Sequence, residues 1–86
     1  MGVAEDLADE LATATLAAME ELDNDRFFMD VARVVGATSP TLQEAFMTSI
    51  RIRMAALRGK RFLEDTLKAK RAGGEAPAAP RDTSAH

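Results

Sequence analysis

The side chains that most often carry out catalysis are scarce in this chain of 86 residues. Its single histidine is His86, and it has no cysteine to serve as a nucleophile or as a thiolate metal ligand. No motif places a general base beside any of the serines, which are Ser39, Ser49 and Ser84. We therefore predict that the protein is not an enzyme and that it uses no cofactor.

One polar run, Asp23-Asn24-Asp25, has the residue types that bind calcium through carboxylate and amide oxygens. A calcium-binding loop starting at Asp23 would need glycine at its sixth position and glutamate at its twelfth. Those positions hold Phe28 and Val34, so the comparison fails and no metal site is predicted. Because Asp and Asn side chains bond readily to nearby backbone groups, we expect a turn here, with Asp23 or Asn24 capping the following helix.

Charge is distributed very unevenly along the chain, although the net charge is only −3. Residues 1–30 carry nine acidic side chains and one basic side chain, a net charge of −8. Residues 51–71 carry eight basic and two acidic side chains, a net charge of +6. Since opposite charges attract, we expect the acidic and basic segments to pair in antiparallel orientation, within one chain or between chains.

Apolar residues at three- and four-residue spacing predict a helix over about 3–22. They form one stripe, which contains Val3, Leu7, Leu11, Ala14, Ala18 and Leu22. A second helix is expected over about 25–35. Its apolar face is broad and contains Phe27, Phe28, Val31, Val34 and Val35. The alternative is that these two helices run together with a bend.

The clearest boundary signals surround the next turn. Gly36 is expected to end the second helix in the left-handed conformation that glycine adopts at little cost. Ser39 can cap the next helix, and Pro40 suits its first position. We expect this third helix over about 40–71, which makes residues 1–71 one helical domain. Residues 72–86 contain two prolines and two glycines and are expected to form a disordered tail.

Two tracks of apolar and small residues run along the predicted third helix. The first contains Leu42, Phe46, Ile50, Met54 and Leu57. The second has the four- and three-residue steps of a coiled-coil seam and contains Ala45, Ser49, Ile52, Ala56, Gly59 and Leu63. Small residues on the second track would let a neighbouring helix approach closely. Gly59 then marks either a bend or the point where the helix changes partners.

Residues 28–46 resemble a helix-turn-helix unit, with Ala32, Gly36 and Leu42 at the spacing of such a unit. A DNA-binding unit places basic or amide side chains at the start of its second helix. Here residues 34–50 contain no lysine or arginine, and Glu44 would repel phosphates. The basic residues that follow are scattered around several helix faces and include Arg51, Arg53, Arg58, Lys60, Arg61 and Lys68. An ordinary corner between two helices is therefore the preferred interpretation.

These patterns predict an all-α three-helix bundle that self-associates through its long third helix. The expected function is a helical assembly or adaptor module in the cytoplasm, with a second copy or another protein as partner and no membrane contact. Its core and contact residues are expected to be Phe46, Ser49, Ile50, Ile52, Ala56, Leu57, Gly59 and Leu63. The alternative is a small DNA-associated protein, of a phage or plasmid packaging or partition type, whose basic residues would bind phosphates.

Overall fold

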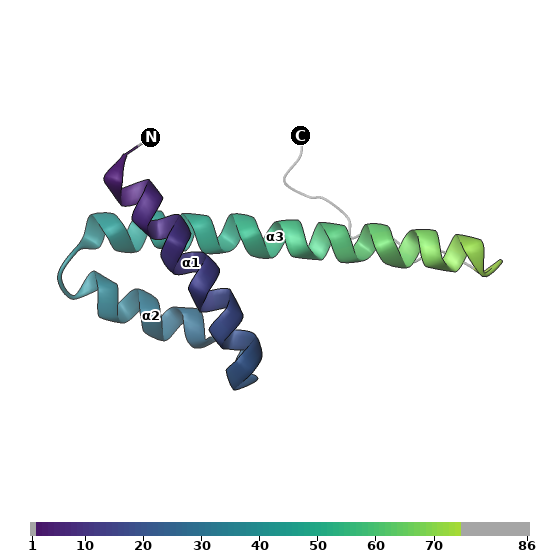
Figure 1. Ribbon diagram of the computed structural model, residues 1–86, viewed down its shortest axis with the longest axis horizontal. Coiled ribbons are helices and arrows are strands. Elements are labelled where there is room, and N and C mark those ends of the chain that lie inside the picture. The colour runs from purple at the N-terminus through teal and green to yellow at the C-terminus, as the bar shows by residue number, and fades with distance from the viewer. Residues whose placement is uncertain (1, 75–86) are drawn as a thin grey trace, which may run out of the picture. The chain divides into compact units, whose positions relative to one another are not determined.

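The computed structural model describes residues 2–74, and all regular structure in this range is α-helical. The helices are α1 (Val3–Leu22), α2 (Phe27–Gly36) and α3 (Pro40–Arg71), shown in Figure 1. The predicted all-α fold with three helices is confirmed. Most of the predicted tail, from residue 75 onward, lies outside the described residues.

The turn between α1 and α2 keeps the two helices separate. Asp23 ends α1 in the left-handed conformation with φ of 53°, and its N–H donates to the Glu20 carbonyl at 3.2 Å. The Asn24 side chain then accepts a hydrogen bond from the Arg26 N–H at 3.0 Å. Neither residue caps α2, whose N-cap is Arg26 without a side-chain bond, so the predicted cap is wrong. The two polar residues instead close α1 and stabilise the turn.

The start of α3 follows the local signals closely. The Ser39 Oγ accepts a hydrogen bond from the Leu42 N–H at 3.0 Å, which satisfies one of the free donors of the first turn. Pro40 is the first residue of the helix, where its missing N–H costs nothing. The helix then continues without interruption through Gly59 to Arg71.

Gly36 does not have the conformation expected for it. Among the described residues, positive φ angles occur only at Asp23 and Gly73. Gly36 instead makes room for the Gln43 side chain, because a Cβ atom at position 36 would lie only 2.3–2.8 Å from the Gln43 amide group. That amide donates from Nε2 to the Ala32 carbonyl at 2.9 Å and so ties α3 to α2.

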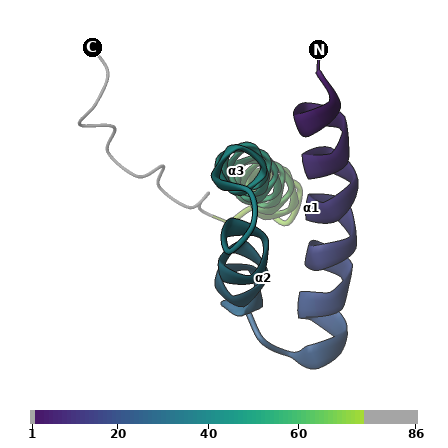
Figure 2. The same cartoon turned by 90° about the vertical axis from the view of Figure 1, so that its left-hand side faces the viewer.

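Contacts between residues fall into two compact units, Met1–Met54 and Ala55–His86. The hydrophobic core lies in the first unit, where α1 and α2 pack with the beginning of α3 (Figure 2). Its fully buried large side chains are Phe46 and Ile50, each 0% exposed. Small residues surround them, since Ala8, Ala12 and Ala32 complete the buried cluster and let the helices approach closely.

The buried face of α1 is not the stripe seen in the sequence. Ala8, Ala12, Thr15 and Met19 are the residues of α1 that are buried. By contrast, Val3 is 75% exposed and Leu7 is 48% exposed. Phe46 and Ile50 of α3 take up the core volume opposite Ala8 and Ala12, so Val3 and Leu7 stay outside it, whereas Met19 is buried and Leu11 and Leu16 pack against the cluster.

Candidate functional site

The predicted interface residues occupy three different environments. Phe46, Ser49 and Ile50 are buried within the first unit, so these three side chains belong to the core of the chain itself. Ile52 is 64% exposed and borders an open groove on the same unit. The other four, which are Ala56, Leu57, Gly59 and Leu63, lie in the second unit and are all exposed.

A polar network joins α1 to α3 at the edge of the core. The Ser49 Oγ donates to the Asp9 Oδ1 at 2.8 Å, and the Arg53 Nε donates to the same Ser49 oxygen at 3.1 Å. The Arg53 guanidinium also lies 3.8 Å from the Asp9 carboxylate. Ser49 is 7% exposed, so these bonds satisfy a hydroxyl that would otherwise be costly to bury. Ser49, which belongs to the predicted seam, therefore binds α1 of its own chain instead of a partner helix.

An open groove of about 710 Å³ lies between the beginnings of α1 and α3. Its three ionisable lining residues are all acidic: Glu5, Asp9 and Glu44. Ala45, Ile52 and Pro40 provide apolar surface on the α3 side. This arrangement disfavours an anionic ligand and would suit a cationic one.

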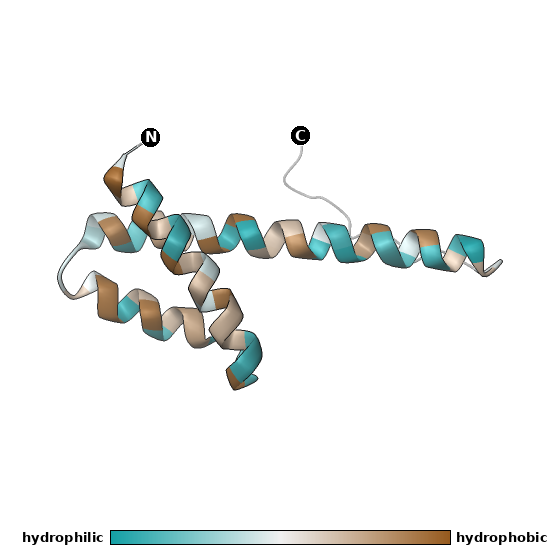
Figure 3. Ribbon diagram, in the orientation of Figure 1, coloured by the Kyte–Doolittle hydropathy of each residue, from teal (hydrophilic) through white to brown (hydrophobic). Residues whose placement is uncertain are grey.

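Between residues 55 and 69, the second unit carries one broad helix surface without charge. At about 100° per residue, the uncharged residues of the segment 55–69 other than Leu57 fall within an arc of roughly 160° around α3, and Lys70 follows on the same side. We call this arc the uncharged face, and it contains Ala55, Ala56, Gly59, Phe62, Leu63, Thr66, Leu67 and Ala69. Leu63 is 58% exposed and Leu67 is 43% exposed. Figure 3 shows that hydrophobic residues recur along α3 as far as its C-terminal turns.

Leu57 lies on the other side of the helix, although it is as exposed as the leucines of the uncharged face, at 50%. Helical spacing places it on the same side as Arg61, four residues later, and Glu64, seven residues or about two turns later. The predicted interface set therefore divides, with Ala56, Gly59 and Leu63 on the uncharged face and Leu57 opposite them.

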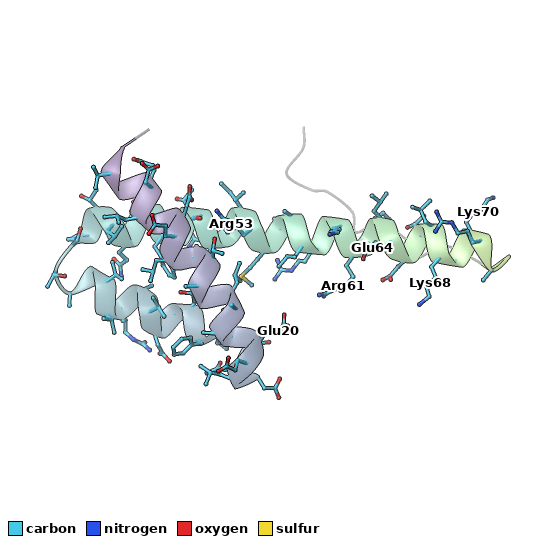
Figure 4. The ribbon with its side chains drawn as sticks, viewed as in Figure 1. Glu20, Arg53, Arg61, Glu64, Lys68 and Lys70 are labelled. Atoms are coloured by element: carbon cyan, nitrogen blue, oxygen red, sulfur yellow. The ribbon has the colours of Figure 1, made fainter. Side chains whose placement is uncertain are left out.

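The basic side chains of α3 point in several directions. Figure 4 shows Arg61 and Lys68 on one side of the helix and Lys70 on the other. Arg53 is engaged with Ser49 and Asp9 in the first unit. Arg51, Arg58 and Lys60 are exposed. No single ridge collects these cations, as the sequence spacing indicated.

The helix-turn-helix-like segment has the expected order of helix, short turn and helix, but its polar side chains are poorly placed for base contacts. Gln43 already donates to the Ala32 carbonyl. The exposed residues near the start of α3 are Thr41, Glu44 and Thr48. All three border the groove together with the acids of α1, where the negative potential opposes phosphate.

A second apolar surface lies on α1 and was not identified as a surface from the sequence. We call it the α1 edge, and it contains Val3, Leu7, Leu11, Ala14 and Ala18. Leu11 and Ala18 are partly buried, and the other three are exposed. Helical spacing places Glu10 and Glu21 beside this edge. The apolar stripe was visible in the sequence, but only the burial of the alanines beside it shows that Val3, Leu7 and Ala14 lie outside the core.

Comparison with known proteins adds no family to this geometry: no family model, no curated protein and no solved structure matches the chain. Within residues 2–74, no helix combines the length and hydrophobicity needed to cross a bilayer. The same residues contain no cluster of three or more His, Cys, Asp or Glu side chains arranged to hold a metal ion. The candidate site consists of the three surfaces described above: the uncharged face, the α1 edge and the acidic groove.

Proposed function

We propose that this protein is a non-enzymatic helical assembly module that self-associates through the uncharged face of α3. The observation that carries the proposal is the exposure of Phe62, Leu63 and Leu67 on an arc that no charged residue interrupts between residues 55 and 69. Grouped apolar side chains on a surface helix are typical of a face that another helix covers. The cytoplasmic location expected from the sequence stays part of this proposal.

The hydrophobic effect favours a complex in which a partner covers the uncharged face. Full burial of one leucine side chain stabilises a complex by about 1.5–3 kcal/mol, and the uncharged face offers two leucines and a phenylalanine. A chain of this size has a small core, and self-association is a common way to bury more apolar surface. The small residues Ala56 and Gly59 on the same face would allow close approach of the partner helix.

The test compares two leucines that differ mainly in their side of the helix. Leu63→Glu should weaken self-association at least about tenfold, because a buried leucine is lost and a charge is introduced into the contact. Leu57→Glu makes the same chemical change at a similarly exposed position on the opposite side and should leave association nearly unchanged. Molar mass measured by light scattering over a range of concentrations gives both dissociation constants.

Two results would contradict the proposal. A wild-type chain that stays monomeric at every accessible concentration would remove self-association as its function. Equal effects of Leu63→Glu and Leu57→Glu would show that the uncharged face is not the contact surface. Circular dichroism of each variant verifies that the helices remain formed.

A DNA-associated role remains the alternative prediction, and the exposed cations of α3 are its only support. Arg58→Glu combined with Arg61→Glu should abolish salt-dependent binding to duplex DNA if those side chains contact phosphates. Absence of wild-type binding at low salt would remove the alternative. The acidic groove repels phosphates and the Gln43 amide is already bonded to the Ala32 carbonyl, so the start of α3 is poorly suited to contact DNA bases. We therefore rank assembly first.

A further inference from the structure

We propose that the uncharged face of α3 docks on the α1 edge of a second copy of the chain. This inference rests on the proposed function and names the surface that receives the face. It concerns two apolar surfaces that are both open in the chain by itself, since Leu63 is 58% exposed and Leu7 is 48% exposed.

The two surfaces agree in form. Each is one side of an amphipathic helix, with small residues beside larger ones: Ala56 and Gly59 with Leu63 on α3, and Ala14 and Ala18 with Leu7 on α1. At about 1.5 Å per residue, α1 is roughly 30 Å long and the segment 55–71 roughly 25 Å. One helix can therefore cover almost the whole length of the other.

Charge decides which surface of the second copy is the better partner. Helix α1 carries six acidic and no basic residues, a net charge of −6. The segment 55–71 carries six basic and two acidic residues, a net charge of +4. Pairing two α3 segments would bring +4 against +4, whereas pairing α3 with α1 brings +4 against −6. Because like charges at a contact repel and opposite charges attract, the α1 edge is favoured over a second α3.

The charges are also grouped at matching intervals. Acids of α1 lie in two blocks, at residues 5–10 and 20–21, with none between them. Bases of the α3 segment lie in two blocks, at 58–61 and 68–71, and the acids Glu64 and Asp65 fall between those blocks. With the helices side by side, each basic block can lie near one of the two acids that border the α1 edge, Glu10 and Glu21, while the two acids of α3 lie opposite the uncharged middle of α1.

Reversing the charges beside each surface tests the pairing directly. The α1 variant carries Glu10→Lys and Glu21→Lys, at the border of the α1 edge. The α3 variant carries Arg58→Glu and Lys60→Glu, at the two borders of the uncharged face. Each variant by itself should associate at least about tenfold more weakly than wild type, since each contact now brings like charges together. An equimolar mixture of the two variants should associate again, because every contact between them pairs opposite charges.

Matched controls reverse the same number of charges away from the proposed contact. Arg61→Glu with Lys68→Glu changes the side of α3 opposite the uncharged face. Glu5→Lys with Glu44→Lys changes the acidic groove, the other surface that a basic helix could use. Both control variants should weaken association less than the α1 and α3 variants do, because the charges that they reverse lie farther from the contact. Sedimentation velocity of the full-length chain at low salt measures all of these variants, and circular dichroism monitors their helix content.

The outcomes separate this inference from the proposed function. If the wild type associates and Leu63→Glu prevents it, but the α1 variant associates normally, the uncharged face is a contact and its partner is not the α1 edge. Loss of association in the groove control instead of the α1 variant would overturn the inference in favour of the groove. A monomeric wild type would overturn the proposed function as well.

Discussion

The two halves of α3 obey the same helical geometry, yet their apolar side chains have opposite surroundings. In the first unit, Phe46 and Ile50 are completely buried against α1 and α2. In the second unit, Leu63 and Leu67 lie on a helix whose described side chains are mostly exposed. The comparison shows that an apolar track on a helix specifies a surface to be covered, while the neighbouring elements decide whether the same chain covers it.

The largest difference between the halves should appear when a phenylalanine is truncated in each. Phe46→Ala is expected to lower the free energy of unfolding by about 3–5 kcal/mol, because it opens a cavity in the core. Phe62→Ala, at a position 36% exposed, should change the unfolding of the dilute monomer by only about 0.5 kcal/mol. Urea unfolding at low protein concentration measures both values.

If the Phe46→Ala variant does not fold, a smaller substitution at both phenylalanines tests the same difference. Phe46→Leu keeps most of the side-chain volume and should still destabilise the chain more than Phe62→Leu does. Equal effects at the two positions would mean that the second unit also has a packed core within the monomer, and the contrast between the halves would be wrong.

A smaller effect is expected from the cap that starts α3. Ser39→Ala removes the acceptor for the Leu42 N–H and should destabilise the first unit by about 0.5–2 kcal/mol. Thr38→Ala, one residue earlier and exposed in the same turn, is the control and should have little effect. Hydrogen exchange measured residue by residue should show the loss in the first turns of α3, and equal effects of both substitutions would argue against the cap.

The smallest effects are expected at two glycines, one in each unit. A Cβ at Gly59 would meet nothing within 4 Å, so Gly59→Ala should stabilise the helix of the monomer by about 0.8–1 kcal/mol through helix propensity. Gly36→Ala should gain much less, because the new methyl group displaces Gln43 from its bond to the Ala32 carbonyl. Thermal unfolding followed by circular dichroism measures the difference.

The same substitutions sharpen the proposed contact. If Gly59 lies where the partner helix approaches closely, Gly59→Ala should weaken association while it stabilises the monomer. If Gly59→Ala both stabilises the monomer and strengthens association, the contact lies away from Gly59.

Most of the helix boundaries could be predicted from the sequence because the signals that set them are local. Ser39-Pro40 starts α3 where expected, and the polar run after Leu22 ends α1 where expected. The prediction failed where the reason for a residue lies in another element. Gly36 was interpreted as a left-handed terminus, but its small size is required by Gln43, seven residues away and on the next helix.

The candidate site was only partly predictable. The seam through Ala56, Gly59 and Leu63 was found from spacing, and its three members are exposed. Ser49 belongs to the same seam by spacing, yet it is buried and bonded to Asp9. Spacing along one helix cannot separate these cases, because both sets of residues repeat with the same period.

The sequence by itself determined the helical fold, the helix ends and the opposite charges of the first and last helices, because these follow from side-chain propensity, capping and composition. Only the tertiary structure decided which side of each helix is buried. On α1, the alanines Ala8 and Ala12 face the core while Val3 and Leu7 stay exposed, since Phe46 and Ile50 take up the available volume and small residues fit best against them. That choice between two neighbouring sides depends on the volumes of side chains about forty residues away, which no local pattern contains.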